Sequence, residues 1–421
     1  MKQSIIFLYA MIFALSISLI AQTNFVKHSG NPILPLGAAG EWDDTEAAYA
    51  HVLYDGSTYR MWYSGAPSPN TYRIGYATSA DGISWDKFGM ALGTGTSGSF
   101  DGIDVWLPWV LFDGTQYEMW YAGNTSSGGI GYITTADPAS WTRQRTTPVL
   151  TGGGFNAWDN YAFGPVVLHT DTLYQMWYGG RLQNSGVWQT GYATSPDGIN
   201  WTKHPNNPVL TVGASSEWDA VAAIVGSVVF DDGLYHMYYH GTNGDPFSGG
   251  EIGYATSPDG VTWTKHPDNP IMTGGAPGTW DDDNTWFPRV LKDGERYRMW
   301  YTGRGSATNG FDRLGYAEDI ITGIETSDGT PPQHFDLKQN YPNPFNPSTT
   351  IEFILSQRAS VTLKVFDLLG KEVATLVDKK VLAAGNHHKV FDASHLASGI
   401  YLYQMQAGQA FKQTRKLVLL K

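Results

Sequence analysis

The sequence predicts an all-β protein: a five-bladed β-propeller closed by its own N-terminal strand, followed by a small C-terminal β-sandwich. The main observation is a phrase, Met-Trp-Tyr, that occurs five times, with Tyr in place of Trp in the fourth copy. The steps between its methionines are 58, 57, 61 and 62 residues, and these are Met61, Met119, Met176, Met237 and Met299. A fixed period of this length, rich in Tyr, Trp, Val and Thr, predicts stacked units of four short strands each.

The composition supports an all-β fold and excludes some functions. Only 16% of the residues are charged while 14% are aromatic and 49 are glycine, which suits short strands and tight turns. The net charge of −12 offers no basic surface, so we expect no nucleic-acid partner. The chain has no cysteine, so neither disulfides nor thiolate metal sites are expected.

The ends of the array predict how the ring closes. Each unit has a second phrase ending in Gly-Tyr, after which units one, three and four continue into an Asp-Gly turn and an outer strand. Unit two has a variant of this segment, and unit five lacks it. Residues Asn24–His28 resemble the outer-strand segment Asn200–His204. We therefore expect Asn24–His28 to pair antiparallel with the strand holding Leu314-Gly315-Tyr316, which would protect an open edge. A strand over 320–324 is the alternative.

The N-terminus predicts export. Lys2 precedes an apolar run from Ile5 to Ile20, and the small Ala21 follows, so residues 1–22 are interpreted as a secretory signal peptide. The alternative is a membrane anchor. The run is shorter than the roughly 20 residues that cross a bilayer, and no second apolar run exists, so no transmembrane segment is expected in the mature chain. The propeller is then expected over 23–322.

A composition change marks a second domain. Residues 323–334 are predicted to be a linker, and alternating apolar segments at 361–368, 388–391 and 399–405 predict the sandwich over 335–421. The text at 340–347, 365–373, 396–401 and 414–421 closely resembles the type A sorting domain of the type IX secretion system. The resemblance implies the type IX secretion machinery as a partner and export through the periplasm to the outer surface of a Gram-negative bacterium. In that family the domain is usually removed, and the cargo is released or attached to the surface.

One face of the propeller is expected to carry the ligand site. The short Asp-Gly turns gather on one face, whereas the longer loops and the starts of the first strands gather on the other, where propeller ligands bind. A residue that is repeated in every unit is expected to have a structural role, as the Trp-Asp pairs do. Catalytic residues must instead break the repeat.

Comparison of the five first strands yields the candidate site residues. The candidate catalytic acids are Glu46, Asp104 and Asp283, and the candidate substrate-binding residues are Trp106, Trp286, Arg289, His51 and Asn284. For any single acid the alternative is a solvated loop residue or a partner of a backbone amide. As a set, carboxylates in adjacent units beside tryptophans predict a sugar site, because aromatic faces stack on sugar rings and carboxylates accept from hydroxyls. In a hydrolase the carboxyls of Glu46 and Asp104 should lie roughly 5–10 Å apart.

The repeated text resembles the blades of five-bladed glycoside hydrolases of families 43 and 32 and their relatives, over residues 25–320. The shared phrases are Val-Leu-x-Asp-Gly-x-x-Tyr-x-Met-Trp-Tyr-x-Gly and Ile-Gly-Tyr-Ala-Thr-Ser-x-Asp-Gly-x-x-Trp. Those enzymes carry acids at the starts of inner strands, often directly before a proline. Here the matching prolines stand in Leu107-Pro108, Gly164-Pro165 and Phe287-Pro288, so the catalytic residues of these families do not carry over.

Three function classes remain open at this point. The first is a secreted glycoside hydrolase that uses paired carboxylates on an extracellular glycan. The second is a carbohydrate-binding or surface-recognition propeller without chemistry, and the third is a structural or adhesive surface protein. No metal or other cofactor is predicted; a calcium ion in the channel would fit the related folds, but no ligand set in the sequence indicates one.

Overall fold

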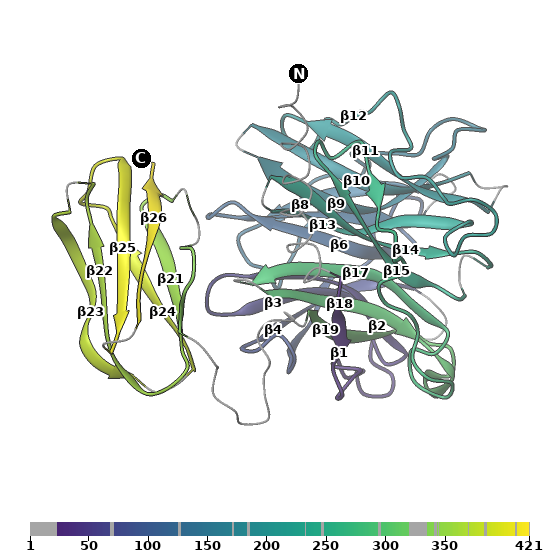
Figure 1. The fold of residues 1–421 in the computed structure, drawn as a ribbon. Helices are drawn as coiled ribbons and strands as arrows, with labels where there is room; N and C mark the ends of the chain where they lie inside the picture. Colours follow the sequence, from purple (N-terminus) through teal and green to yellow (C-terminus); the bar gives the residue numbers. More distant parts are fainter. Residues whose placement is uncertain are drawn as a thin grey trace, which may run out of the picture. The chain divides into compact units, whose positions relative to one another are not determined.

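The computed structural model describes residues 23–319 and 335–420, apart from gaps at 68–70, 125–127, 171, 183–185, 232, 246–247, 294–295, 341–342, 344, 369, 383–384 and 409–410. The predicted signal peptide and linker lie outside the described residues. The described part is almost entirely β, with one short 3-10 helix, η1 (Ser306–Thr308) (Figure 1). Within it, no helix is long and apolar enough to span a membrane. The chain divides into two compact units, Met1–Ile320 and Ile321–Lys421.

The first compact unit contains five antiparallel three-strand meanders, one for each copy of the repeat. A fourth, outer strand follows in three of them, and in the fifth meander this position is taken by β1 (Phe25–Lys27). The meanders are β2 (Glu46–Tyr54), β3 (Tyr59–Ala66) and β4 (Arg73–Ser79) with β5 (Asp86–Leu92); β6 (Val105–Phe112), β7 (Tyr117–Gly123) and β8 (Ile130–Thr135); β9 (Tyr161–Thr170), β10 (Leu173–Arg181) and β11 (Trp188–Ser195) with β12 (Thr202–Lys203); β13 (Ala222–Asp231), β14 (Leu234–Thr242) and β15 (Glu251–Ser257) with β16 (Thr264–Lys265); and β17 (Asn284–Asp293), β18 (Arg296–Arg304) and β19 (Arg313–Asp319).

The pairing of β1 confirms the strand partner predicted from the sequence. β1 runs antiparallel to β19, with Lys27 opposite Ala317. The backbone continues this contact beyond the strand, where His28 N donates to Tyr316 O at 2.9 Å. The first residues of the propeller region therefore complete the last meander.

A buried aspartate organises every meander. In each one it accepts a hydrogen bond of 2.8 to 3.1 Å from the tyrosine of the Met-Trp-Tyr phrase and forms an ion pair of 2.6 to 2.8 Å with a cation from the outer segment. In unit five the cation is Lys27 of β1, so the N-terminus supplies the group that this unit lacks. The five sets are Asp43 with Tyr63 and Lys87, Asp101 with Tyr121 and Arg143, Asp159 with Tyr178 and Lys203, Asp219 with Tyr239 and Lys265, and Asp281 with Tyr301 and Lys27.

A second repeated contact joins neighbouring units through the tryptophan of the phrase. Its indole N–H donates to a backbone carbonyl in the terminal turn of the next unit, from Trp62 to Pro138, Trp120 to Gly198, Trp177 to Gly260 and Trp300 to Gly82. Unit five has no such turn, and unit four accordingly carries Tyr238 instead of tryptophan. Phe25 of β1 packs edge-to-face on Tyr238, with 5.7 Å between ring centroids.

The first strands of the meanders lie at the centre of the first compact unit. Each contacts the first strand of the next unit, and β17 of unit five contacts β2 of unit one. Their register shifts at bulges where Tyr49, Leu107 and Phe287 adopt positive φ angles of 50°, 50° and 44°. These three side chains join an apolar cluster, so the centre is filled with hydrophobic groups at this level.

The second compact unit has its own core between two antiparallel sheets, as the sequence predicts for the C-terminal sandwich. One sheet orders β20 (Asp336–Leu337), β21 (Ser348–Leu355) and β24 (Gly385–Asp392). The other orders β23 (Glu372–Leu382), β22 (Ala359–Phe366), β25 (Gly399–Ala407) and β26 (Phe411–Leu419).

The aspartate interaction predicts a large effect of removing Lys27. Lys27→Met should lower the free energy of unfolding by about 1–3 kcal/mol, because it leaves the buried Asp281 carboxylate without its cation. Arg296→Met is the control, since its pair with Glu318 is exposed and 3.6 Å long, and it should cost less than about 1 kcal/mol. Chemical denaturation measures both, and equal losses would contradict the role given to Lys27.

Candidate functional site

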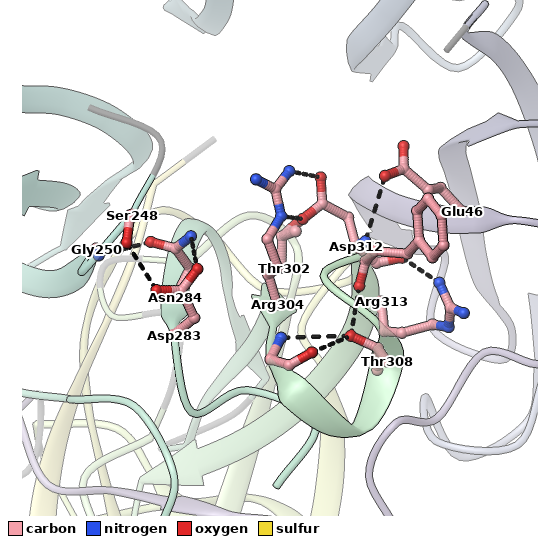
Figure 2. Close-up of polar contacts among 12 residues, drawn as sticks. Glu46, Ser248, Gly250, Asp283, Asn284, Thr302, Arg304, Thr308, Asp312 and Arg313 are labelled. Atoms are coloured by element: carbon pink, nitrogen blue, oxygen red, sulfur yellow. Dashed lines mark hydrogen bonds and ion pairs between the residues drawn. The ribbon is translucent and has the colours of Figure 1, made fainter. Parts of the chain in front are cut away.

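Glu46, the first residue of β2, lies in a buried polar group near the loops. Its side chain is 3% exposed. Tyr72 Oη donates to Glu46 Oε2. The backbone N of Asp312 donates to Glu46 Oε1 at 3.4 Å (Figure 2). Burial and, secondly, the charge of Asp312 raise the pKa of Glu46. The Glu46 carboxyl therefore holds its proton to a higher pH than an exposed glutamate does.

Asp312 is the second acid of this group and is held differently. It lies between η1 and β19. Arg304, at the end of β18, forms a bidentate contact with it, in which Nε donates to Oδ1 and Nη2 donates to Oδ2, each at 2.9 Å (Figure 2). Tyr49 Oη also donates to Asp312 Oδ2. Burial raises the pKa of Asp312 while Arg304 opposes that shift. Because Arg304 compensates the charge of Asp312, Glu46 is the member of the pair that takes the proton.

Asp104 lies directly before β6 and is 7% exposed. Its Oδ1 accepts from the backbone N of Tyr72 at 2.9 Å, and its Oδ2 accepts from Asn124 Nδ2 at 2.7 Å. Tyr72 therefore joins the two predicted acids, since its backbone binds Asp104 and its hydroxyl binds Glu46. We name Glu46, Asp104, Tyr72, Arg304 and Asp312 the acid cluster.

The two predicted tryptophans lie against the acid cluster. Tyr72 stacks on Trp106 with 5.8 Å between centroids and 19° between planes. The guanidinium of Arg304 lies over the Trp286 ring at 4.8 Å. The indole N–H groups of Trp106 and Trp286 are buried without an acceptor among the described residues.

Asp283 and Asn284 form a separate contact between units four and five. Asp283 is exposed and accepts from Ser248 Oγ at 2.7 Å, and Asn284 Oδ1 accepts from Gly250 N at 2.6 Å (Figure 2). Asn284 Nδ2 also reaches Asp283 Oδ2 at 3.3 Å. Both side chains thus hold the loop of unit four onto unit five.

Arg289 and His51 form a third group, further along the first strands. Arg289 is buried, its Nη1 donates to Gly226 O, and its guanidinium lies 5.3 Å from the Trp109 ring. His51 lies 4.2 Å from the same ring and its Nε2 is 2.9 Å from Val110 O. Burial, helped by the charge of Arg289, lowers the pKa of His51 to about 3. The structure thus divides the eight sequence candidates into three groups.

The centre of the fold does not fit the calcium ion of related folds. Among the described residues no group of three His, Cys, Asp or Glu side chains could hold a metal. The buried guanidinium of Arg289, which contacts the Gly226 carbonyl and the Trp109 ring, would also repel a cation at that level. The chemistry of the site is therefore derived from side chains alone.

The first-strand comparison missed three members of the acid cluster, although the same reasoning finds them. Three residues before the Gly of the second phrase, the five units carry Tyr72, Gly128, Trp188, Gly250 and Asp312. Five residues after each methionine they carry Ala66, Asn124, Arg181, Thr242 and Arg304. Both columns break the repeat, and they contain Tyr72, Asp312, Arg304 and the Asp104 partner Asn124.

Comparisons with known proteins identify the second compact unit and relate the first to carbohydrate-active enzymes. Residues 339–420 match the family model described as a secretion system C-terminal sorting domain. An uncharacterized protein of Mycobacterium tuberculosis is 29% identical over 225 residues, which is 50% of this chain and 72% of that protein. A beta-1,2-mannobiose phosphorylase of Thermoanaerobacter sp. (strain X514) is 28% identical over 116 residues, covering 25% of this chain and 37% of the enzyme.

Solved structures share the fold of the first compact unit. A glycoside hydrolase aligns with a TM-score of 0.56 at 17% identity, over 69% of this chain and 92% of its own. A structure from work on the GH130 family of mannoside phosphorylases, which contains glycoside hydrolases that target beta-1,2 mannosidic linkages in Candida mannan, aligns with a TM-score of 0.53 at 17% identity, over 70% of this chain and 93% of its own. The fold is therefore GH130-like. The expected relation to families 43 and 32 is not confirmed, and family 130 is closer.

The raised pKa of Glu46 predicts that replacing this residue by its neutral analogue, glutamine, stabilises the folded protein by an amount that depends on pH. Below the ordinary value of 4.5 the carboxyl is protonated in both the folded and unfolded states. As the pH rises, the unfolded state releases this proton first, so the group destabilises the folded protein progressively until its folded pKa is passed. Glu46→Gln should therefore raise the melting temperature more at pH 8 than at pH 4.

Calorimetry at the two pH values tests this expectation. Glu318→Gln is the control, because it makes the same chemical change at a surface glutamate whose pair with Arg296 is exposed and 3.6 Å long. If Glu46→Gln instead destabilises the protein more at pH 8, Glu46 is held as a carboxylate and the assignment of the proton is wrong.

Proposed function

We propose that the five meanders are the blades of a closed five-bladed β-propeller. The proposal is supported by the contact of β17 with β2, the indole hydrogen bond from Trp300 of unit five to Gly82 of unit one, and the single parallel pair of Arg313 with Ala47. In this arrangement the starts of β2 and β6 and the end of β18 meet at one mouth of the channel, which is where the acid cluster lies.

We propose that the protein is an extracellular carbohydrate-active enzyme that cleaves glycosidic bonds with Glu46 and Asp104. The observation that carries the proposal is Tyr72, which joins a carboxyl group of raised pKa to a second carboxylate in the neighbouring unit. Pairs of carboxyl groups in different protonation states are the machinery of glycoside hydrolysis. GH130-like neighbours and the sorting domain support the same class.

In the proposed reaction Glu46 is the general acid. Its proton passes to the glycosidic oxygen as the bond from that oxygen to the anomeric carbon breaks. Asp104 accepts the proton of the water that attacks this carbon, while Tyr72 and Asn124 hold the carboxylate in place. Arg304 and Asp312 are positioning residues, because they act through Glu46. Trp106 is half-buried and stacks on Tyr72 and Phe163, so a sugar ring would contact the part of its indole that these rings leave uncovered.

A second candidate function is carbohydrate binding without chemistry. Both oxygens of Asp104 already accept hydrogen bonds from protein donors, and the residues directly before the central prolines are not acidic. In this case Tyr72, Trp106 and the acids would form a recognition surface for sugar hydroxyls and ring faces.

Mannosides are the first substrates to test, since the similar phosphorylase and the GH130 structure both act on β-1,2-mannosidic bonds. The assay incubates the full chain with β-1,2-mannobiose with and without inorganic phosphate and separates mannose from sugar phosphate. We expect Glu46→Gln to lower kcat by about 10²–10⁴-fold with a small change in KM. Trp106→Ala should mainly raise KM.

The same variants distinguish the two candidates. Glu318→Gln, at the surface, should leave turnover unchanged. Turnover that survives both Glu46→Gln and Asp104→Asn would reject these acids as the catalytic pair. A protein that turns over no glycan in a broad panel, yet binds one more weakly after Trp106→Ala than after Glu46→Gln, supports the binding function.

We also propose export by the type IX system to the surface of a Gram-negative bacterium. Truncation after residue 330 removes the sorting domain and leaves the first compact unit intact, since each unit has its own core. The truncated chain should therefore accumulate, folded, in the periplasm. Cell fractionation in a type IX-competent host measures this, and delivery of the truncated chain to the surface would overturn it.

A further inference from the structure

A cavity of about 430 Å³ lies at the opposite ends of the first strands of units one to three. Its rim residues follow Leu53 of β2, Leu111 of β6 and Leu168 of β9. Glu46 begins β2 and Tyr54 ends it, so at about 3.3 Å per residue the cavity is roughly 26 Å from the acid cluster. We propose that this turn-side cavity is a second binding site, for a neutral oligosaccharide.

Exposed aromatic rings form the apolar part of the turn-side cavity. Tyr54, Phe112 and His169 line it from three successive units, and Phe112 is 48% exposed. Each ring is backed by the tyrosine of the next strand in a stacked pair, with centroids 4.3, 4.5 and 3.9 Å apart. One face of each ring is covered, so the ring is held rigidly while its other side is left toward the cavity. Rigid aromatic faces are what sugar rings stack upon.

Carboxylates supply the polar part of the lining. Asp55 is exposed and forms an ion pair of 2.8 Å with Arg60. This pair compensates the charge of the Arg60 guanidinium. Asp113 is exposed and accepts from the backbone N of Thr115 and Gln116, at 2.7 and 2.8 Å. Glu118 also lines the cavity. The excess of carboxylates over Arg60 favours hydroxyl donors and disfavours acidic glycans.

The cavity is lined by residues of units one to three, and the aromatic pattern ends at unit five. The position of Phe112 is occupied by Phe230 in unit four and by Lys292 in unit five, where Lys292 forms an ion pair with Asp231. Phe230 is 55% exposed and packs on Tyr235 like the others, but it does not line the cavity. A pocket of this volume, with apolar walls and a few fixed polar groups, suits a small ligand better than a protein surface.

Affinity electrophoresis of the full chain tests the second site, with yeast mannan, xylan and mixed-linkage β-glucan as neutral probes and polygalacturonate as the acidic one. At least one neutral glycan should retard the wild type. Phe112→Ala should weaken that binding by about tenfold or more. Phe230→Ala is the matched control and should bind like the wild type, and Tyr54→Ala repeats the test should Phe112→Ala unfold.

These outcomes distinguish the turn-side cavity from the acid cluster. The inference rests on the proposed function only for the class of its ligand, a carbohydrate. Binding that persists in Glu46→Gln and is lost in Phe112→Ala supports a second site even if the protein hydrolyses nothing. Binding lost in Trp106→Ala but unchanged in Phe112→Ala overturns it. The proposal is also overturned if no neutral glycan retards the wild type. It is overturned as well if sedimentation shows a concentration-dependent dimer that Phe112→Ala abolishes, because this face would then bind a second copy of the chain.

Discussion

The structure of the first compact unit depends on one interaction, a buried aspartate shared by a tyrosine hydroxyl and a cation. A carboxylate withdrawn from water is stable only with charged or hydrogen-bonding partners. In every unit the acid precedes the first strand, the tyrosine comes from the second and the cation from the outer segment, so one contact fixes three parts of a meander. In unit five the cation is Lys27, and the beginning and end of the repeat array therefore meet in the same contact.

The acid cluster lies where this repetition ends. Tyr49, Leu107 and Phe287 fill the centre of the fold at the bulges, where the families that the sequence resembles keep acids. The carboxyl groups stand instead toward the loops, above that apolar layer, in Glu46 and Asp104. Burial beside hydrophobic groups penalises charge and raises the pKa of Glu46, while the fixed guanidinium of Arg304 compensates the charge of Asp312.

The two ends of the first strands are used differently. At the loop end, polar side chains from units one, two and five bond to one another and leave little surface exposed. At the turn end, aromatic rings repeat and stay exposed because short Asp-Gly turns cannot cover them. The sorting domain has a hydrophobic core of its own.

Repeat period, strand order, the partner of the N-terminal strand and the sorting domain were all determined by the sequence, because each is encoded within one unit or in local patterns. The membership of the site was decided only by the tertiary structure. Glu46 and Asp312 are 266 residues apart and meet because unit five lies beside unit one. Asp283, which is also an acid directly before a first strand, binds a neighbouring loop instead. Sequence columns show which residues break the repeat, whereas the closeness of loops from different units depends on how the strands pack around the centre.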